Sequence, residues 1–246
     1  MRNKFFKSVF FILVSVVFIL SVYQIFLYIS ETNRNEKAVD DLEQKTTISS
    51  DGEAVADNSF PFNLDFNELQ KENEDIVAWL YCENTPINYP VLKGTDNEYY
   101  LNHSVNGNYN KNGSLFIDCR CNSNFTDFNT IVYGHNMKTE KMFGSLTNYK
   151  KQSYYDEHPT LYLIMPDYNY KIELFSGFVA SADSDLYALL KSVDEKKEFI
   201  NTAIKKSTFI STVSVCETDT IITLSTCSYE YSNARYVVIG KIDNIN

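Results

Sequence analysis

Glycine, proline and histidine are scarce in this sequence of 246 residues, which contains eight, five and three of them. The few glycines form no G-x-G-x-x-G pattern and no other phosphate-cradling loop, so the sequence offers no support for a nucleotide site. Five cysteines are too few for a dense disulfide framework in a chain of this length, and none forms a paired C-x-x-C motif. We therefore expect neither a metal site nor a cofactor.

Acidic residues are absent from the first 30 positions. All 32 Asp and Glu residues follow residue 30, together with 19 of the 22 Lys and Arg residues. A domain with this excess of negative charge lacks the basic face that phosphate contacts require, so we expect no nucleic-acid partner.

One long apolar run, Val9 to Ile29, contains no charged residue. A helix needs roughly 20 such residues to cross a membrane. Arg2, Lys4 and Lys7 precede the run, which predicts a cytoplasmic N-terminus. The run is longer than a usual signal-peptide core and no small-x-small cleavage site follows it, which favours an uncleaved anchor over a removed signal peptide. We expect residues 1–30 to form a single-pass anchor in the cell membrane, with the rest of the chain outside.

The polar stretch 31–59 predicts a stalk or linker, helical in part up to Gln44. Folded structure is expected to start near Phe60, so that residues 60–246 form one extracellular domain. Asp65 lies three residues before Glu68, as in a capping box. Apolar residues then recur at helical spacing, which predicts a helix from Asn67 to Leu80.

Short runs rich in Ile, Val, Tyr, Phe and Thr dominate the sequence after Pro86, and turn residues separate them. This pattern predicts a mainly β domain, either an antiparallel sandwich or a closed barrel. One helix, over 193–206, is expected between the last strands because its apolar residues share one face. The seven runs are INYPVLKG, GSLFIDCR, NTIVYGH, TLYLIM, YKIELFSGFVA, DTIITLSTC and RYVVIGKI.

Three scarce side chains stand at the ends of these predicted strands: Cys227, His135 and Arg235. An odd number of cysteines leaves at least one free thiol in the chain. A thiol that attacks an acyl group needs a proton carrier and a positive group for the oxyanion, which His135 and Arg235 can supply. Each residue also has a purely structural explanation, as a buried thiol, a loop histidine or a surface ion pair.

The motifs around these residues add a resemblance that spans about Phe60 to the C-terminus. TLSTC and YGHNM resemble the active-site motifs of the sortases, membrane-anchored cysteine transpeptidases of Gram-positive bacteria. The DNEYYLNH segment, the helices before the barrel and the helix before the cysteine strand are similar to class B. The resemblance implies a closed eight-stranded β-barrel with N-terminal helices and a helical insertion before the active-site cysteine strand.

The resemblance also implies the chemistry. Cys227 would attack the threonine carbonyl of a C-terminal sorting signal resembling NPxTx on a surface protein. His135 would protonate the leaving amine and deprotonate the incoming one, an amine of peptidoglycan, while Arg235 would stabilise the oxyanion. No third carboxylate is assigned to His135, although the loop after the cysteine contains Glu230. The positions implied to bind the sorting signal are Asn97, Leu101, Tyr133, Ser225, Leu186 and Tyr187.

Two other functions stay open. The same site could work as a hydrolytic cysteine peptidase with water as the acceptor. The domain could also be a membrane-tethered binding module whose Cys227 is only structural. Cys119 and Cys121 are two residues apart and would face the same side of a strand; we expect them to be free thiols, because a disulfide between them would be strained.

Overall fold

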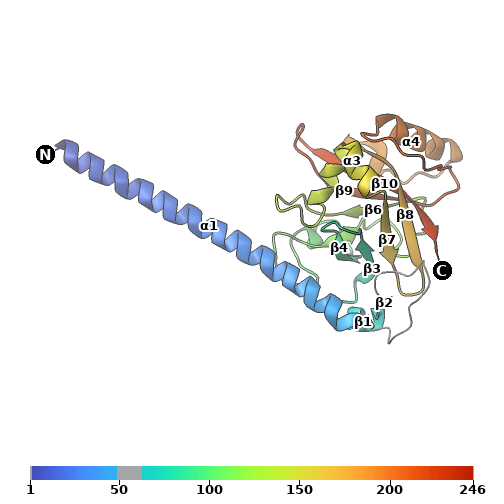
Figure 1. The fold of residues 1–246 in the computed structure, drawn as a ribbon, viewed down its shortest axis with the longest axis horizontal. Helices are drawn as coiled ribbons and strands as arrows, with labels where there is room; N and C mark the ends of the chain where they lie inside the picture. The colour runs from blue at the N-terminus through green and yellow to red at the C-terminus, as the bar shows by residue number, and fades with distance from the viewer. Residues whose placement is uncertain (1, 49–62, 246) are drawn as a thin grey trace.

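The computed structural model describes residues 2–48 and 63–245, with a long helix projecting from a β-rich domain (Figure 1). Eight strands close into a barrel in the order β10-β8-β7-β3-β4-β5-β6-β9, which confirms the predicted fold class. The barrel strands are β3 Ile76–Tyr81, β4 Asn88–Leu92, β5 Leu115–Ile117, β6 Asn129–Tyr133, β7 Thr160–Ile164, β8 Asn169–Ser181, β9 Ile221–Cys227 and β10 Ala234–Asn244.

Helices and one small sheet complete the structure. Two short strands before the barrel, β1 Thr47–Ile48 and β2 Asn63–Leu64, pair with each other outside it. The helices are α1 Arg2–Thr46, α2 Phe66–Glu72, α3 Gln152–Glu157 and α4 Val193–Lys206, with 3-10 turns η1 Tyr99–Leu101, η2 Gly144–Lys150 and η3 Asp185–Tyr187.

The barrel mixes parallel and antiparallel pairs, so the expectation of an antiparallel sheet was incomplete. Strands β4 and β5 pair in parallel, and so do β6 and β9. Parallel strands bring their carboxyl ends to the same edge of a sheet, and the start of an antiparallel neighbour reaches that edge too. The ends of β6 and β9 and the start of β10 therefore meet at one rim of the barrel.

The predicted helix from Asn67 to Leu80 was wrong in its second half. Its start is correct, because the side chain of Asp65 accepts hydrogen bonds from the backbone N–H groups of residues 67 and 68. The helix α2 ends at Glu72, and residues 76–81 form β3 between β4 and β7. A central strand buried on both faces is apolar throughout, and over a few residues this pattern cannot be distinguished from a buried helix.

Helix α4 has the bounds that its apolar spacing predicts. Its first turn is closed by a capping box, in which Ser192 accepts from the Glu195 N–H and the Glu195 carboxylate accepts from the Ser192 N–H. Ile200 and Ala203 are buried, and the helix packs on the long strand β8, where the hydroxyl of Ser176 donates to the Ala203 carbonyl at 2.6 Å. The chain then returns to the barrel as β9.

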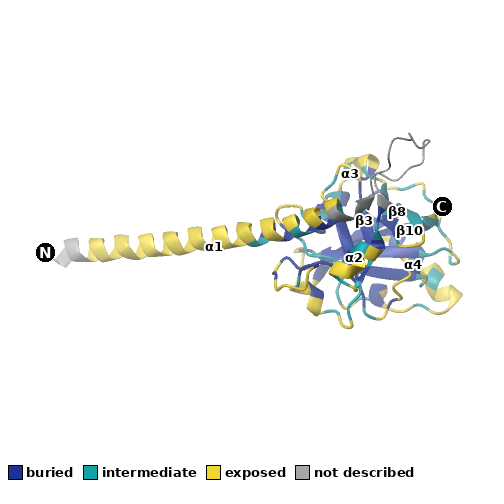
Figure 2. Ribbon diagram, turned by 90° about the horizontal axis from the view of Figure 1, so that it is seen from below, coloured by how far each residue is buried: buried dark blue, intermediate teal, exposed yellow. Residues whose placement is uncertain are grey.

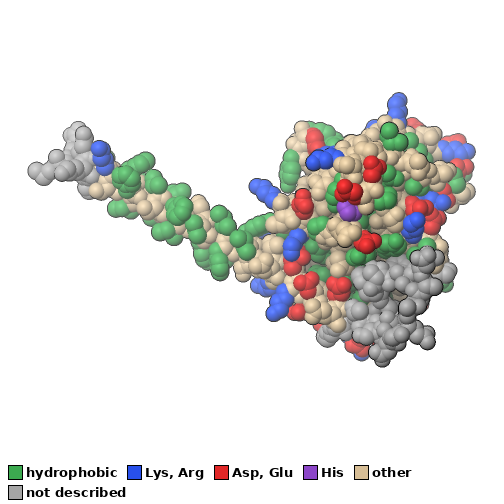
Figure 3. Space-filling model, viewed as in Figure 1, with side chains coloured by type: hydrophobic (Ala, Val, Ile, Leu, Met, Phe, Trp, Pro, Cys, Tyr) green, Lys and Arg blue, Asp and Glu red, His purple; other side chains and the backbone are tan. Residues whose placement is uncertain are grey.

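Helix α1 has two parts with different surroundings. Its apolar residues from position 6 to 29 are exposed along the projecting rod, which Figure 2 shows in yellow and Figure 3 largely in green. This is the one helix in the described chain that is long and apolar enough to cross a membrane, with a mean hydropathy of 2.6 over its most apolar window. Exposed apolar side chains on such a rod are consistent with a membrane anchor.

The second part of α1 is docked on the domain and is not a free stalk. Side chains spaced three or four residues apart are buried there, and two of them belong to the main hydrophobic core. They are Thr32, Asn35, Val39 and Leu42. The expected linker therefore contains a packed helix up to Thr46 and the short strand β1, while residues 49–59 of that linker and the expected domain start near Phe60 lie outside the described residues.

Candidate active site at the barrel rim

The rim formed by β6, β9 and β10 brings together the three side chains singled out in the sequence. Arg235 is the direct cross-strand partner of Cys227. Tyr133 pairs with Ser225 in the parallel β6–β9 pair. Strand β6 ends at Tyr133, and His135 follows it by two residues, just as Cys227 follows Ser225 by two residues on β9. His135, Cys227 and Arg235, which we call the row, thus come from three neighbouring chain segments at one rim.

Backbone contacts on both sides of His135 hold its segment against β9. The N–H of Gly134 donates to the carbonyl of Ser225 at 3.2 Å. The side-chain amide of Asn136 donates to the carbonyl of Cys227 at 2.7 Å. Because both neighbours of the histidine are fixed to the strand that carries the cysteine, one main-chain and one side-chain hydrogen bond set the spacing between the two segments.

The imidazole of His135 has a defined partner. Its Nε2 lies 2.7 Å from the carbonyl oxygen of Leu101. A carbonyl oxygen can only accept a hydrogen bond, so Nε2 carries the hydrogen in this contact. In the neutral ring, Nδ1 is then the nitrogen that can accept a proton. Leu101 was expected to contact substrate; the structure assigns its backbone a second task, which is to orient the histidine.

The glycine before the histidine has a packing reason. A Cβ at Gly134 would lie 2.4 Å from a methyl of Leu115 and 2.7 Å from the ring of Phe143. Contacts this short do not occur in folded proteins, so any side chain here would push the His135 segment away from the barrel. The G-H pair in the sequence reflects this close approach.

Cys227 differs from the two buried cysteines in its surroundings. All five are free thiols. Cys82 and Cys121 are buried, and burial raises the pKa of each thiol. Cys227 is half-buried at the rim, and a directly opposed pair on two strands has its Cβ atoms about 5 Å apart, which puts the sulfur beside the half-buried Arg235.

The predicted wall of the binding groove lies next to this row. Leu186 and Tyr187, on η3, are both buried. The hydroxyl of Tyr187 is 2.8 Å from that of Ser225, and its ring stacks on Tyr133 at 6.1 Å between centroids. Burial raises the pKa of Tyr187, while the hydrogen bond with Ser225 and the charge of Arg235 act in the opposite direction. Its hydroxyl is therefore within electrostatic reach of the row.

Sequence reasoning missed two residues that hold this wall. Arg120 donates to both carboxylate oxygens of Asp118, at 2.9 and 2.7 Å, and to the carbonyl of Tyr187 at 3.0 Å. Tyr133 donates to the same carboxylate at 2.8 Å. Burial opposes ionisation of Asp118, but the hydrogen bonds and charge of Arg120 outweigh it and lower the pKa to about 2. The signal in the sequence was an acid and a base two residues apart just after a strand.

A family model for the Sortase domain matches residues 80–243. The chain belongs to the sortase family. This sortase is 35% identical to sortase B of Listeria monocytogenes over 231 residues, with 92% of each chain covered. It is 32% identical to sortase B of Staphylococcus aureus over 249 residues, with 100% of each chain covered.

Solved structures support the same class. The S. aureus sortase B–substrate complex matches this sortase with a TM-score of 0.70 at 34% identity, covering 74% of this chain and 85% of that one. Sequence and structural relatives alike are class B, so this sortase is a class B cysteine transpeptidase, an enzyme with a cysteine active site.

Two polar residues near the motifs of this sortase have structural partners of their own. Asn97, expected to contact substrate, accepts a hydrogen bond from the N–H of Cys119 at 2.7 Å and so ties down the turn after β5. Glu230 pairs with Lys150 and with the hydroxyl of Ser228. Both carboxylate oxygens of Glu230 therefore have partners other than His135.

Cys119 and Cys121 do not lie on a strand of this sortase, contrary to the expectation. Strand β5 ends at Ile117, and the two thiols follow in a turn. Within residues 2–48 and 63–245, no group of three or more His, Cys, Asp or Glu residues could hold a metal ion.

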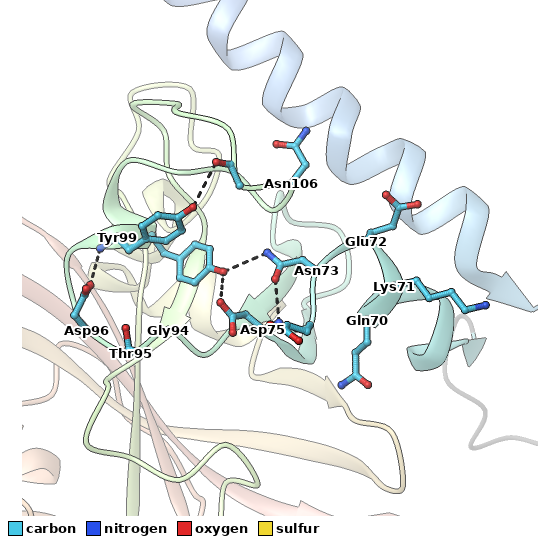
Figure 4. Close-up of a pocket in the computed structure, with 13 residues that line it drawn as sticks. Gln70, Lys71, Glu72, Asn73, Asp75, Gly94, Thr95, Asp96, Tyr99 and Asn106 are labelled. Carbon is cyan, nitrogen blue, oxygen red and sulfur yellow. Dashed lines mark hydrogen bonds between the residues drawn. The ribbon is translucent and has the colours of Figure 1, made fainter.

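A separate hollow of about 610 Å³ lies between the end of α2 and the segment around η1 (Figure 4). Inside it, the Tyr100 hydroxyl donates to Asp75 at 2.6 Å and accepts from the Asn73 amide at 3.2 Å. Its lining includes none of the residues of the row or the groove wall, so its polar groups belong to a different part of the surface. The lining residues are Gln70–Asp75, Gly94–Asp96, Tyr99, Tyr100, Asn106 and Gly107.

Proposed function

We propose that this sortase cleaves a C-terminal sorting signal resembling NPxTx after its threonine and joins the new carboxyl end to a peptidoglycan amine. The observation that carries the proposal is the row of His135, Cys227 and Arg235 at one rim. A nucleophile, a proton carrier and a fixed cation within one row are the three parts that acyl transfer through a thioester needs.

In the first half of the proposed reaction, the sulfur of Cys227 attacks the threonine carbonyl carbon. The thiol proton passes to His135, whose Nε2 is engaged with Leu101, so Nδ1 is the nitrogen that receives it. The carbon–nitrogen bond breaks, His135 gives the proton to the leaving amine, and a thioester remains on the cysteine. The guanidinium of Arg235 donates to the oxygen that becomes negatively charged.

In the second half, the acceptor amine attacks the thioester carbon. His135 takes the proton that the amine loses, the carbon–sulfur bond breaks, and the proton returns to Cys227. The rings of Tyr133 and Tyr187, with Leu186 beside them, offer an apolar wall along which an extended signal peptide can lie. Hydroxyl, amide and carbonyl groups for its backbone would come from Ser225, Asn97 and Leu101.

The membrane anchor would help this reaction by placing the enzyme close to its substrates. A single-pass helix with its basic N-terminus in the cytoplasm would place the domain on the outer face of the cell membrane. Enzyme, exported substrate protein and membrane-linked peptidoglycan precursor would then share one surface, which raises their effective concentrations. The proposed partners are surface proteins with a sorting signal and the peptidoglycan amine; no cofactor is required.

A peptide assay separates the candidate functions. The full chain in detergent micelles is incubated with an NPxTx peptide and an amine acceptor, and the products are identified by mass spectrometry. We expect a ligated product whose mass includes the acceptor and none with Cys227→Ala. Release of free acid only would support a hydrolytic peptidase, and no conversion of any peptide in a signal library would support a binding module.

A further inference from the structure

The segment that follows β6 carries the histidine and has a strained backbone. Residues 136–143 form a loop that closes when the N–H of Phe143 donates to the carbonyl of His135 at 3.0 Å. Glu140 and Met142 have φ angles of 63° and 52°, in the left-handed region that residues with side chains rarely adopt. Such a conformation persists only when surrounding contacts hold it. Part of what holds this loop is the anchor helix.

The docked part of α1 contacts the loop through the side chain of Glu36. Its carboxylate pairs with the ammonium of Lys141 at 2.9 Å. It also accepts from the buried hydroxyl of Tyr89 at 3.2 Å, and that hydroxyl accepts from the N–H of Met142 at 3.3 Å. One carboxylate on the helix is thus connected directly to the side chain of one loop residue and, through one hydroxyl, to the backbone of the next.

The same helix also contacts residues 112 and 113, which pack on the segment whose carbonyl orients the histidine. The amide of Asn35 lies 3.5 Å from the carbonyl of Gly113. Gly113, with φ of 58°, packs so closely on the preceding segment that a Cβ would lie 2.7 Å from the carbonyl oxygen of Leu101. That oxygen is the one that accepts the hydrogen bond from His135. A second contact of the same kind joins the amide of Asn112 to the hydroxyl of Thr32 at 3.2 Å.

We propose that residues 31–43 of α1 are a positioning element for His135, and that Glu36 is its principal positioning residue. The inference rests on the proposed function only in taking His135 as the proton carrier. One helix contacts the loop that follows His135 and the segment beside Leu101, whose carbonyl orients the imidazole. Through these contacts the helix holds the imidazole in place near Cys227. The helix that leaves the membrane is in this way also part of the support of the active site.

The test uses the full chain in detergent micelles and two independent measurements. Hydrogen exchange followed by mass spectrometry reports the opening of residues 136–143. Steady-state ligation of an NPxTx peptide to an amine reports kcat and KM separately. In Glu36→Gln and in Lys141→Gln, we expect exchange of the loop to rise by about 5-fold, the upper range for one partly exposed ion pair. We expect kcat to fall by about 3- to 5-fold with KM unchanged, because misplaced groups slow the chemical step.

Matched controls and a rescue make the outcome decisive. Asp40→Asn is the control for Glu36→Gln, because it removes a negative charge from an exposed position one turn along α1. Lys138→Gln is the control for Lys141→Gln, because it removes a positive charge from an exposed position in the loop. Both controls should match the wild type. The exchanged pair Glu36→Lys with Lys141→Glu should restore slow exchange and most of kcat. Unchanged exchange and kcat in Glu36→Gln, or equal effects in Asp40→Asn, would overturn the inference. If the wild type ligates no peptide while exchange responds as expected, the proposed function fails and the support of the loop by α1 stands.

Discussion

Two arginines, Arg120 just after β5 and Arg235 at the start of β10, illustrate two ways of using a guanidinium. Arg120 donates to both oxygens of Asp118 and to the carbonyl of Tyr187. The guanidinium of Arg235 makes a single hydrogen bond within the described chain, to the carbonyl of Ala234 at 3.0 Å. The donors of Arg120 are thus used on protein acceptors, whereas most donors of Arg235 have no acceptor within the described chain, as its proposed role requires.

The same contrast holds for their neighbours. Asp118 is fully buried, and Tyr133 donates to its carboxylate. Cys227 and His135 are half-buried, and hydrogen bonds from the Gly134 N–H and the Asn136 side-chain amide to β9 fix their segments. Removing one partner of a buried, hydrogen-bonded ion pair costs much stability. A partly exposed side chain whose backbone is fixed can exchange its hydrogen-bond partner at little cost. The comparison predicts large activity effects in the row and large stability effects in the buried pair.

The largest effect is expected for Cys227→Ala. Removing the nucleophile should lower kcat/KM for peptide ligation by at least about 10⁴-fold, because no other group can form the thioester. The half-buried side chain contributes little packing, so the melting temperature should change by less than about 3 °C. Ligation is followed by mass spectrometry and melting by circular dichroism. Cys216→Ala, at an exposed thiol, is the control and should be fully active.

The next largest effect separates the two arginines directly. Arg235→Lys should lower kcat by about 10²- to 10³-fold, the cost of losing one oxyanion donor, because an ammonium lacks the planar fork. Arg120→Lys should leave kcat within about 3-fold but raise KM, since the Tyr187 wall loosens. Steady-state kinetics on both variants measure this split. Near-native turnover in Arg235→Lys would remove Arg235 from the reaction.

The third prediction concerns the buried carboxylate. The folded-state pKa of Asp118 is about 2, below its ordinary value of 3.8, so its stabilising contribution is present above about pH 4 and is lost as pH falls through 2. The shift corresponds to about 2 kcal/mol of unfolding free energy. Urea unfolding between pH 5 and pH 2 should show this loss in the wild type and a flatter profile in Asp118→Asn. That variant should also be about 2 kcal/mol less stable at pH 7, because it loses the charge-assisted hydrogen bonds that Arg120 and Tyr133 donate to the carboxylate. Parallel pH profiles would contradict the assignment.

The smallest effect is expected for Glu230→Gln. Hydrogen bonds from Lys150 and Ser228 lower the pKa of Glu230 to about 2, but the pair is partly exposed and solvent screens it. We expect a stability change below about 1 kcal/mol and activity within about 2-fold of wild type. Thermal melts and the ligation assay measure both. If turnover instead fell by about an order of magnitude, this carboxylate would be a group that orients His135.

Much of the fold followed from local pattern. The seven β runs after Pro86 occur where β-rich composition and turn residues predicted them, and the helix 193–206 occurs where apolar spacing predicted it. The eighth strand, β3, was mistaken for the end of a helix, because its burial on both faces removes the alternation that marks an exposed strand. The parallel pairing of β6 with β9 was not predicted either, since pairing depends on which distant segment a strand meets.

The candidate site divides in the same way. The motifs TLSTC and YGHNM were sufficient to single out Cys227 and His135 and to suggest the family. The sequence analysis missed the Asp118–Arg120 pair and the contact of Glu36 with Lys141, because the sequence does not indicate which partners these side chains meet. The polar composition of residues 31–46 even suggested a linker, although a docked helix needs only a narrow buried stripe.

Composition and periodicity alone determined an apolar N-terminal run, a mainly β domain and a free thiol at the end of a strand, because these properties depend on residues that are close in the chain. Only the tertiary structure decided that the end of β6, the end of β9 and the start of β10 share one rim, and that one helix supports the histidine loop. Several of these contacts join segments that are about a hundred residues apart in the chain. They exist only when the barrel closes and its core excludes water.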